Sequence, residues 1–274
     1  MEGTATGTRS YLYSFWFLLL ATMGGGMLAE LAFDVLRSTG ARERLPALLA
    51  LVIPPAVSGL VVPYLLIRLL YRARLREFGI RWIDPQRRVA PWLLGSSVLA
   101  LVAWLAFWGA ICVALLMATK TAPDRVPLTL AEFHGKNPLH MLLHGASSPR
   151  VVATVIHMTL LVGFIEELFG RGFLQNALDR RYTRVFGRGR FTVPASTLLA
   201  AVLFAFWHTQ WLSGDPKTIL SSAAISMTIV LVPSLLLCLV YEKTRSMLAV
   251  IVLHDVIDGG KLLIWYLWSW ILPG

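Results

Sequence analysis

Long apolar runs constrain the fold of this chain more than any other sequence feature. Runs of about 20 apolar residues match the roughly 30 Å hydrocarbon core of a lipid bilayer. Hydrophobic residues make up 57% of the 274 residues and charged residues 15%, whereas soluble globular domains average about 25% charged residues. The sequence therefore predicts an all-α, polytopic transmembrane helical bundle, and it argues against a soluble enzyme or a disordered chain.

We expect about eight membrane spans within a single transmembrane domain that covers residues 1–274. The last two are short, and we place a break between them at Gly259-Gly260. The predicted spans cover residues 11–33, 46–70, 90–117, 151–178, 192–212, 218–241, 246–258 and 260–272.

Two arginine-rich segments predict the orientation of these spans. Residues 68–88 carry a net charge of +5 and residues 179–190 a net charge of +4, out of +10 for the whole chain. The positive-inside rule places both segments in the cytoplasm, and counting eight spans then places both termini there. Residues 118–150 become the largest extracytoplasmic loop. The basic segments are expected to contact anionic lipid head groups of the bilayer, and we expect no nucleic-acid partner.

Ionisable residues inside the spans mark a candidate site, because each costs about 2.5–3.5 kcal/mol on insertion scales. They gather in three late spans. They are Glu166, Glu167 and Arg171 in the fourth span, His208 in the fifth, and His254 and Asp258 in the seventh. Phe204 lies one helical turn before His208 and can pack against its ring. The first three spans are nearly free of charge, and Glu30 lies near one end, where it can reach water.

Helical spacing predicts which of these side chains face each other. Glu167 and Arg171 are four residues apart, in the favourable order for an ion pair. Glu166 is rotated by about 100° from Glu167 and has no counter-ion on its own helix, which suits a general base. His254 and Asp258 are also four residues apart, so both can point into one cavity.

The three motifs together resemble those of a known protease family. Glu-Glu-x-x-x-Arg at 166–171, Phe-x-x-x-His at 204–208 and His-x-x-x-Asp at 254–258 are similar to the motifs of the CPBP (CAAX protease and bacteriocin-processing, or ABI) intramembrane proteases. That family includes the type II CAAX prenyl endopeptidases. The resemblance covers about residues 150–260, the expected catalytic core, whereas residues 1–149 resemble the family only as hydrophobic spans with a basic loop.

The resemblance implies an intramembrane endopeptidase that hydrolyses a peptide bond of a membrane-associated protein or peptide. By motif position, Glu166 and His208 would activate the hydrolytic water, and His254 and Asp258 would face the oxyanion. The supporting residues would be Glu167, Arg171 and Phe204. Asp258 stands where the eukaryotic prenyl endopeptidases use Asn, and an ionised Asp cannot donate a hydrogen bond. Asp258 would donate only if protonated; otherwise it would orient His254 and stabilise its charged form.

A metal ion is an alternative to the glutamate-protease interpretation. The sequence lacks an HExxH motif, and the two site histidines lie on different spans. We expect no cofactor, and the alternative is Zn²⁺ bound by Glu166, His208 and His254 with water as the fourth ligand.

The 118–150 loop holds three further histidines, His134, His140 and His144. The last two are four residues apart and would share a helix face, as metal-binding pairs do. No Cys, Asp or Glu stands beside them to complete a metal site, so we favour an amphipathic segment at the membrane interface.

Other function classes stay open at this stage. Buried Glu–Arg and His–Asp pairs can simply lock helices together, and intramembrane Glu and His chains also serve proton-coupled transporters. A non-catalytic immunity or scaffold protein with the same fold is a further alternative. We favour catalysis because all three motifs are intact in one chain.

The ratio of arginine to lysine indicates the class of organism that encodes this protein and the kind of substrate to expect. The chain has twenty Arg against five Lys, a pattern of high-GC bacterial genomes. We therefore expect a multi-pass protein of the bacterial inner (cytoplasmic) membrane, and we favour a substrate that is not prenylated. A co-encoded sorting or processing partner is an open alternative.

Overall fold

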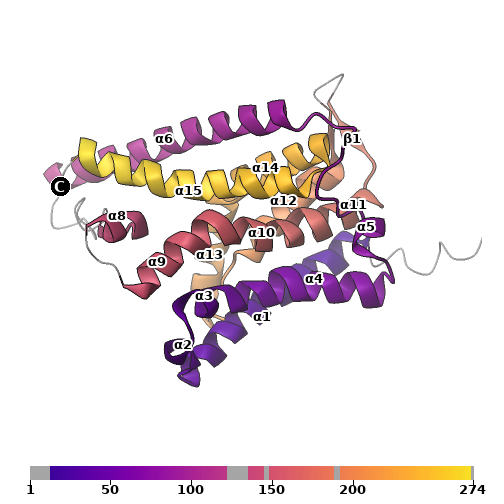
Figure 1. Cartoon of the computed structure of the whole chain (residues 1–274), viewed down its shortest axis with the longest axis horizontal. Coiled ribbons are helices and arrows are strands. Elements are labelled where there is room, and N and C mark those ends of the chain that lie inside the picture. Colours follow the sequence, from indigo (N-terminus) through magenta and orange to yellow (C-terminus); the bar gives the residue numbers. More distant parts are fainter. Residues whose placement is uncertain (1–12, 122–134, 145–147, 188–191, 273–274) are drawn as a thin grey trace, which may run out of the picture.

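The computed structural model describes residues 13–121, 135–144, 148–187 and 192–272 (Figure 1). Nearly all of them lie in helices, which confirms the predicted all-α class. The only strands among the described residues are a two-residue antiparallel pair, β1 (Val185–Phe186) and β2 (Val193–Pro194), and turns and short irregular segments connect the helices.

The first half of the chain forms three long helical segments with short helices between them. In chain order, its elements are α1 (Phe15–Ser38), α2 (Ala41–Arg44), the continuous segment α3 (Ala47–Ala56), η2 (Val57–Val61), α4 (Val62–Leu65) and η3 (Leu66–Leu70), then α5 (Leu75–Phe78), α6 (Ala90–Thr121) and α8 (Pro138–Leu143). Here η denotes a π-helical stretch.

The second half carries the predicted motifs on four segments. In chain order, its elements are the continuous segment α9 (Pro149–Ile156), η5 (His157–Leu161), α10 (Val162–Glu167), η6 (Leu168–Gln175) and α11 (Asn176–Asp179), then α12 (Ala195–Trp207), α13 (Pro216–Ile229), α14 (Leu231–Thr244) and α15 (Met247–Ile271).

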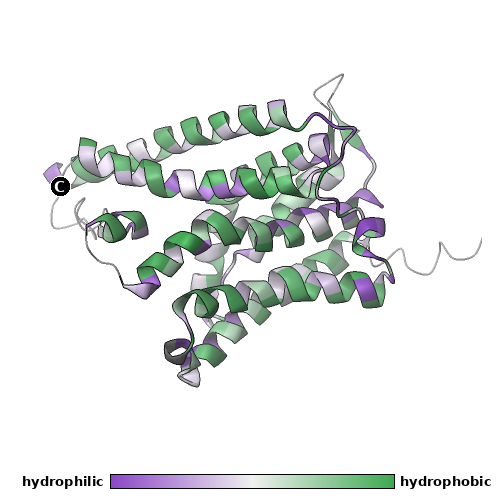
Figure 2. Cartoon of the chain, viewed as in Figure 1, coloured by the Kyte–Doolittle hydropathy of each residue, from purple (hydrophilic) through white to green (hydrophobic). Residues whose placement is uncertain are grey.

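The helices form a bundle in which α6 and α15 lie side by side along one edge (Figure 1). The α9–α11 segment runs beneath α15, and α1 with the α3–η3 segment forms the opposite edge. Helices α12, α13 and α14 lie behind them. Figure 2 shows that most of the helical surface is hydrophobic and that hydrophilic residues gather at the end of the bundle that holds α5. This distribution fits a multi-pass membrane protein.

The predicted count of eight spans is not confirmed by the structure. Among the described residues, four helical segments are long and apolar enough to cross a membrane, namely 15–38, 47–70, 90–118 and 149–179. A fifth candidate is the pair α13 and α14, which meet at an angle of 48°. Helix α12 has only 13 residues, about 20 Å at 1.5 Å per residue, because the chain turns directly after Trp207. The predicted fifth span at 192–212 is therefore too long.

The predicted seventh and eighth spans are one helix. Helix α15 continues without interruption for 25 residues through Gly259-Gly260, so the predicted break there is wrong. A Cβ atom built on Gly260 would lie 2.4 Å from Leu101 Cδ2 of α6. This glycine thus allows close helix packing and does not end the helix.

Merging these two spans changes the expected topology. Helices α1 and α15 both begin at the arginine-rich end, where Phe15 N donates to Tyr182 Oη at 2.9 Å and Met247 N donates to the carbonyl oxygen of Arg81 at 2.9 Å. Helix α15 ends at the opposite end of the bundle (Figure 1). The described chain thus starts and ends at opposite ends of the bundle, and the prediction of two cytoplasmic termini is not confirmed.

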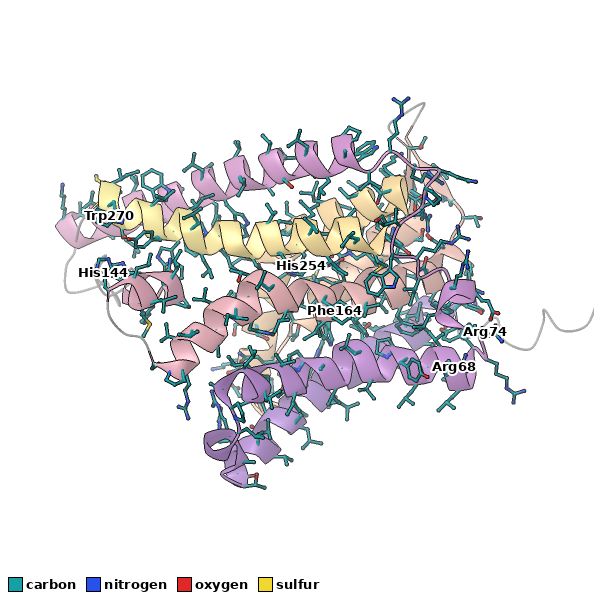
Figure 3. All side chains as sticks on the ribbon, viewed as in Figure 1. Arg68, Arg74, His144, Phe164, His254 and Trp270 are labelled. Carbon is teal, nitrogen blue, oxygen red and sulfur yellow. The ribbon has the colours of Figure 1, made fainter. Side chains whose placement is uncertain are left out.

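The two arginine-rich segments do lie at one end, as predicted. Arg180 Nη2 donates to the carbonyl oxygen of Glu77 at 3.0 Å, and its guanidinium lies 4.8 Å from the ring centroid of Phe78. Arg68 and Arg74 lie at the same end (Figure 3).

Helix α15 is not among the candidate spans above, but its 25 residues are long enough to cross a bilayer. We expect it to cross as one span, and a pair of reporter fusions tests this. Alkaline phosphatase fused after Arg245 should stay inactive in the cytoplasm, whereas the same reporter fused after Leu272 should be exported and active, because one span separates the two positions. Two short spans would leave both fusions on one side. Equal activity of the two fusions, at equal expression, would contradict the single helix.

Candidate active site

The motif helices approach closely where α10 packs on α15. A Cβ atom on Gly163 would lie 2.5 Å from Asp255 Oδ1 and 2.9 Å from the carbonyl oxygen of Ile251. Only a residue without a side chain fits this contact. Directly after it, the helix carries Glu166 and Glu167 and then changes to the π-helical stretch η6. Such stretches are frequent at functional sites.

A fully buried ion pair lies at the centre of the site. Arg171 Nη1 donates to Glu167 Oε1 at 2.8 Å, and neither side chain is exposed. Arg171 Nη2 also donates to the carbonyl oxygen and hydroxyl of Ser234 on α14, at 2.7 and 3.0 Å. Its guanidinium carbon lies 4.5 Å from the ring centroid of Phe204 on α12. The pair predicted from the spacing is therefore present, and it joins three helical segments.

His254 joins this centre from α15. Its Nδ1 atom lies 2.6 Å from Glu167 Oε1, so one carboxylate oxygen contacts both the guanidinium and the imidazole. His254 is 6% exposed and lies about two turns after the start of α15 (Figure 3). Because Nδ1 is occupied by Glu167, the orientation of the ring is fixed and Nε2 points away from the ion pair.

Glu166 faces both histidines. Its Oε2 atom lies 3.3 Å from His208 Nε2 and 3.7 Å from His254 Nε2. On its own helix Glu166 has no counter-ion, as predicted. Its partners come from α15 and from the residue that follows α12, a placement that the sequence did not provide.

Hydrogen-bond accounting shows that the Glu166–His208 pair has room for one further proton. His208 Nδ1 lies 2.9 Å from the carbonyl oxygen of Phe204. A carbonyl only accepts, so Nδ1 carries a hydrogen. In a neutral ring, Nε2 is then an acceptor that faces the carboxylate acceptor of Glu166. One proton on either group turns this contact into a hydrogen bond, so the pair is arranged to take up or release a proton.

Asp258 completes the predicted set and has a partner that the sequence analysis missed. Asp258 Oδ2 lies 3.6 Å from His254 Nε2, and Asp258 Oδ1 accepts from Lys261 Nζ at 3.0 Å. Lys261 follows Asp258 by three residues, so helical spacing could have revealed the pair. The predicted break at Gly259-Gly260 placed Lys261 in a separate span and hid it.

These groups line a cavity of about 700 Å³ inside the bundle. Glu166, His208, His254, Asp258 and Lys261 supply its polar side. The remaining wall is mostly apolar, with side chains from α6, α13 and α14. The Phe204 ring lies 4.9 Å from that of His208, which confirms their predicted contact. Chemically, the cavity combines two carboxylates, two imidazoles and a cation beside a mostly apolar wall.

An apolar groove adjoins this cavity. It has a volume of about 480 Å³ and lies between α6, α13 and α14. The residues that line both spaces are Trp104, Phe107, Ile229, Pro233 and Ile257. Because the cavity and the groove share these residues, the polar groups of the cavity lie at one end of a larger, mostly apolar space.

Glu30 is partly exposed, so it can reach water as expected, and it also makes contacts that the sequence did not reveal. Its two carboxylate oxygens accept from the backbone N–H groups of Trp211 and Leu212, at 2.6 and 2.7 Å. This contact ties α1 to the turn that follows His208, and so it helps to position that histidine. A carboxylate within an otherwise apolar span was the available signal.

Of the other described histidines, His140 and His144 lie apart from the four candidate catalytic residues, whereas His157 lines the same cavity. The rings of His140 and His144 lie 4.2 Å apart, and His144 packs near Trp270 at the far end of the bundle (Figure 3). Their predicted interfacial role is not tested by this arrangement, and His134 lies outside the described residues. His157 lines the cavity, but its Nδ1 atom is buried without a hydrogen-bond partner in the described part of the chain.

The metal-binding alternative gains no support from the arrangement of these donors and is not tested by it. In the described segments, no group of three or more His, Cys, Asp or Glu side chains is arranged to hold a metal ion. Glu166 and His208 instead contact each other directly. We therefore derive no step through zinc.

Comparison with known proteins identifies a family for the motif-bearing segment. Residues 148–260 match the family model described as type II CAAX prenyl endopeptidase Rce1-like. This match confirms the resemblance of this segment to the CPBP (CAAX) protease family, and it covers all three motifs. No curated protein and no solved structure matches the chain.

The buried ion pair generates a stability prediction. Arg171→Met should lower the free energy of unfolding by about 3–5 kcal/mol, because it leaves the Glu167 carboxylate buried without its counter-ion. Thermal unfolding of the detergent-purified protein, followed by circular dichroism, measures the change.

Two further variants make this prediction specific. Glu167→Gln combined with Arg171→Met should be less damaging than Arg171→Met alone, because no uncompensated charge remains. Arg74→Ala is the surface control, since Arg74 is 81% exposed beside Glu77 and exposed pairs contribute little. An Arg171→Met protein as stable as the Arg74→Ala protein would contradict the central role of the pair.

Proposed function

We propose that this protein is an intramembrane endopeptidase of the glutamate type, which uses Glu166 and His208 to activate water and needs no metal ion. One observation carries the proposal: Glu166 Oε2 lies within 3.7 Å of the Nε2 atoms of both His208 and His254, and all three side chains line one cavity. The family match over residues 148–260 supports proteolysis as the chemistry.

The proposed reaction is peptide-bond hydrolysis in two steps. Glu166, with His208, takes a proton from a water molecule, and the water oxygen bonds to the scissile carbonyl carbon. The carbonyl oxygen becomes an oxyanion, which accepts a hydrogen bond from the Nε2–H group of charged His254. The C–N bond then breaks, and the proton held by Glu166 and His208 passes to the leaving nitrogen. The products are a carboxylic acid and an amine, and the site regains its starting protonation.

The surroundings of the site favour a membrane-associated protein or peptide as the substrate. The apolar groove between α6, α13 and α14 shares its walls with the cavity, so an apolar part of the substrate can lie there while the scissile bond reaches Glu166. The apolar helices support a location within a membrane. From the arginine-rich composition, we propose the bacterial inner membrane.

Substitution of the two water-activating residues tests the proposal. Glu166→Gln and His208→Ala should each lower kcat/KM by about a hundredfold to ten-thousandfold, because each removes a group that moves the proton. The assay uses purified protein in lipid nanodiscs with two quenched fluorescent peptides. One is a farnesylated CAAX peptide, and the other carries a cleavage site found by comparing protein termini in membranes that express wild type or Glu166→Gln.

His157→Gln is the matched control, because His157 lines the same cavity but lies outside the proposed proton path. Its activity should stay within about tenfold of wild type, and all three variants should keep the wild-type Tm. Folded Glu166→Gln and His208→Ala proteins with full activity would refute the assignment. A wild-type protein that cuts neither peptide nor any membrane protein would favour a non-catalytic role.

Metal removal gives an independent test. Activity should survive exhaustive treatment with EDTA and 1,10-phenanthroline, since the proposed water activation uses only side chains. Elemental analysis of the purified protein should find no stoichiometric zinc. One zinc per chain, together with activity that chelation abolishes and added Zn²⁺ restores, would overturn the glutamate-type mechanism.

A further inference from the structure

Lys261 belongs to the site although none of the three motifs contains it. Its Nζ atom lies 3.0 Å from Asp258 Oδ1, and both side chains line the cavity. The Lys261 side chain is 25% exposed and that of Asp258 15%. This pair is therefore largely removed from solvent, where screening is weaker than at a surface.

The pair defines what Asp258 can do. An ammonium group only donates hydrogen bonds, and an ionised carboxylate only accepts them. Asp258 Oδ1 is occupied by Lys261, and its other oxygen lies 3.6 Å from His254 Nε2. Asp258 is thus placed as an acceptor toward both neighbours and does not serve as the donor to an oxyanion.

The carboxylate of Glu166 lies close to that of Asp258, so the positive charge of Lys261 is needed to balance one of them. Glu166 Oε2 lies 3.7 Å from the same His254 Nε2 that Asp258 Oδ2 approaches to 3.6 Å. Two negative charges thus flank one nitrogen atom in a mostly apolar enclosure, where their repulsion is poorly screened. Lys261 balances one of them and leaves Glu166 as the carboxylate available to the water.

We propose that Lys261 is a positioning residue of the reaction: its ammonium group keeps Asp258 ionised and oriented, so that His254 is held as the donor to the oxyanion. This inference rests on the proposed hydrolysis. The eukaryotic prenyl endopeptidases use a neutral Asn at the motif position of Asp258. In this chain the Asp258–Lys261 pair, whose two charges balance, takes the place of that neutral side chain.

Coupled substitutions test whether the two residues act as a unit. Lys261→Met and Asp258→Asn should each lower kcat by about a hundredfold with little change in KM, because a misplaced donor affects the transition state most. Combining Asp258→Asn with Lys261→Met should restore kcat to within about tenfold of wild type, since the neutral amide then has no unpaired cation beside it. Lys261→Arg, which keeps the charge, should also stay within about tenfold.

The same nanodisc assay measures these rates with the farnesylated CAAX peptide and the peptide from the terminus comparison. Lys243→Met is the control, because Lys243 lies near the arginine-rich end of α14, and it should behave as wild type. Tm values of all variants separate lost folding from lost catalysis. A rescue by the double variant cannot result from a structural role of Lys261 alone.

Specific outcomes would overturn the inference. A fully active Lys261→Met protein would do so, and so would a double variant no more active than the weaker single variant. If Glu166→Gln abolishes activity while Lys261→Met does not, the positioning role fails and the proposed function stands. If Glu166→Gln remains active, the proposed function itself fails.

Discussion

The buried ion pair between Glu167 and Arg171 is the interaction on which the rest of the site depends. Both side chains are fully buried, and separating such a pair leaves an uncompensated charge at a cost of about 3–5 kcal/mol. Arg171 reaches Ser234 of α14 and the Phe204 ring of α12, while Glu167 contacts His254 of α15. Four helical segments are thereby held in one mutual arrangement, and the pair acts as a fixed support for the imidazole of His254.

The buried position of Glu167 also determines where the Glu166 side chain points. Adjacent residues on a helix point about 100° apart, so anchoring Glu167 in the core turns Glu166 toward the cavity. Helix α12 then supplies His208 because it is short: it ends at Trp207, inside the bundle, and Glu30 holds the following turn through two backbone N–H groups. A helix long enough to cross the membrane would have carried the chain past this level.

The sequence predicted the local pairs well because helical spacing determines them. The Glu167–Arg171 bond and the Phe204–His208 packing are i,i+4 contacts, and the structure contains both. Contacts between helices, such as Glu166 with His208, depend on packing that periodicity does not encode. The Gly259-Gly260 pair misled the prediction for a related reason, since glycine can either interrupt a helix or admit a neighbour. At Gly260, close packing against Leu101 decides in favour of the neighbour.

Charge balance links this packing to chemistry. The cluster contains three carboxylates, Glu166, Glu167 and Asp258, and two permanent cations, Arg171 and Lys261. One negative charge remains when both imidazoles are neutral, and a net charge in an apolar enclosure is costly. One further proton on His208, His254 or Glu166 makes the cluster neutral. In the proposed hydrolysis this proton resides on His254, the donor to the oxyanion, so the resting cluster is neutral. Glu166 Oε2 and His208 Nε2, which lie 3.3 Å apart, are then left to take the proton that the water releases. The packing that balances the charges therefore also sets the protonation that the proposed hydrolysis requires.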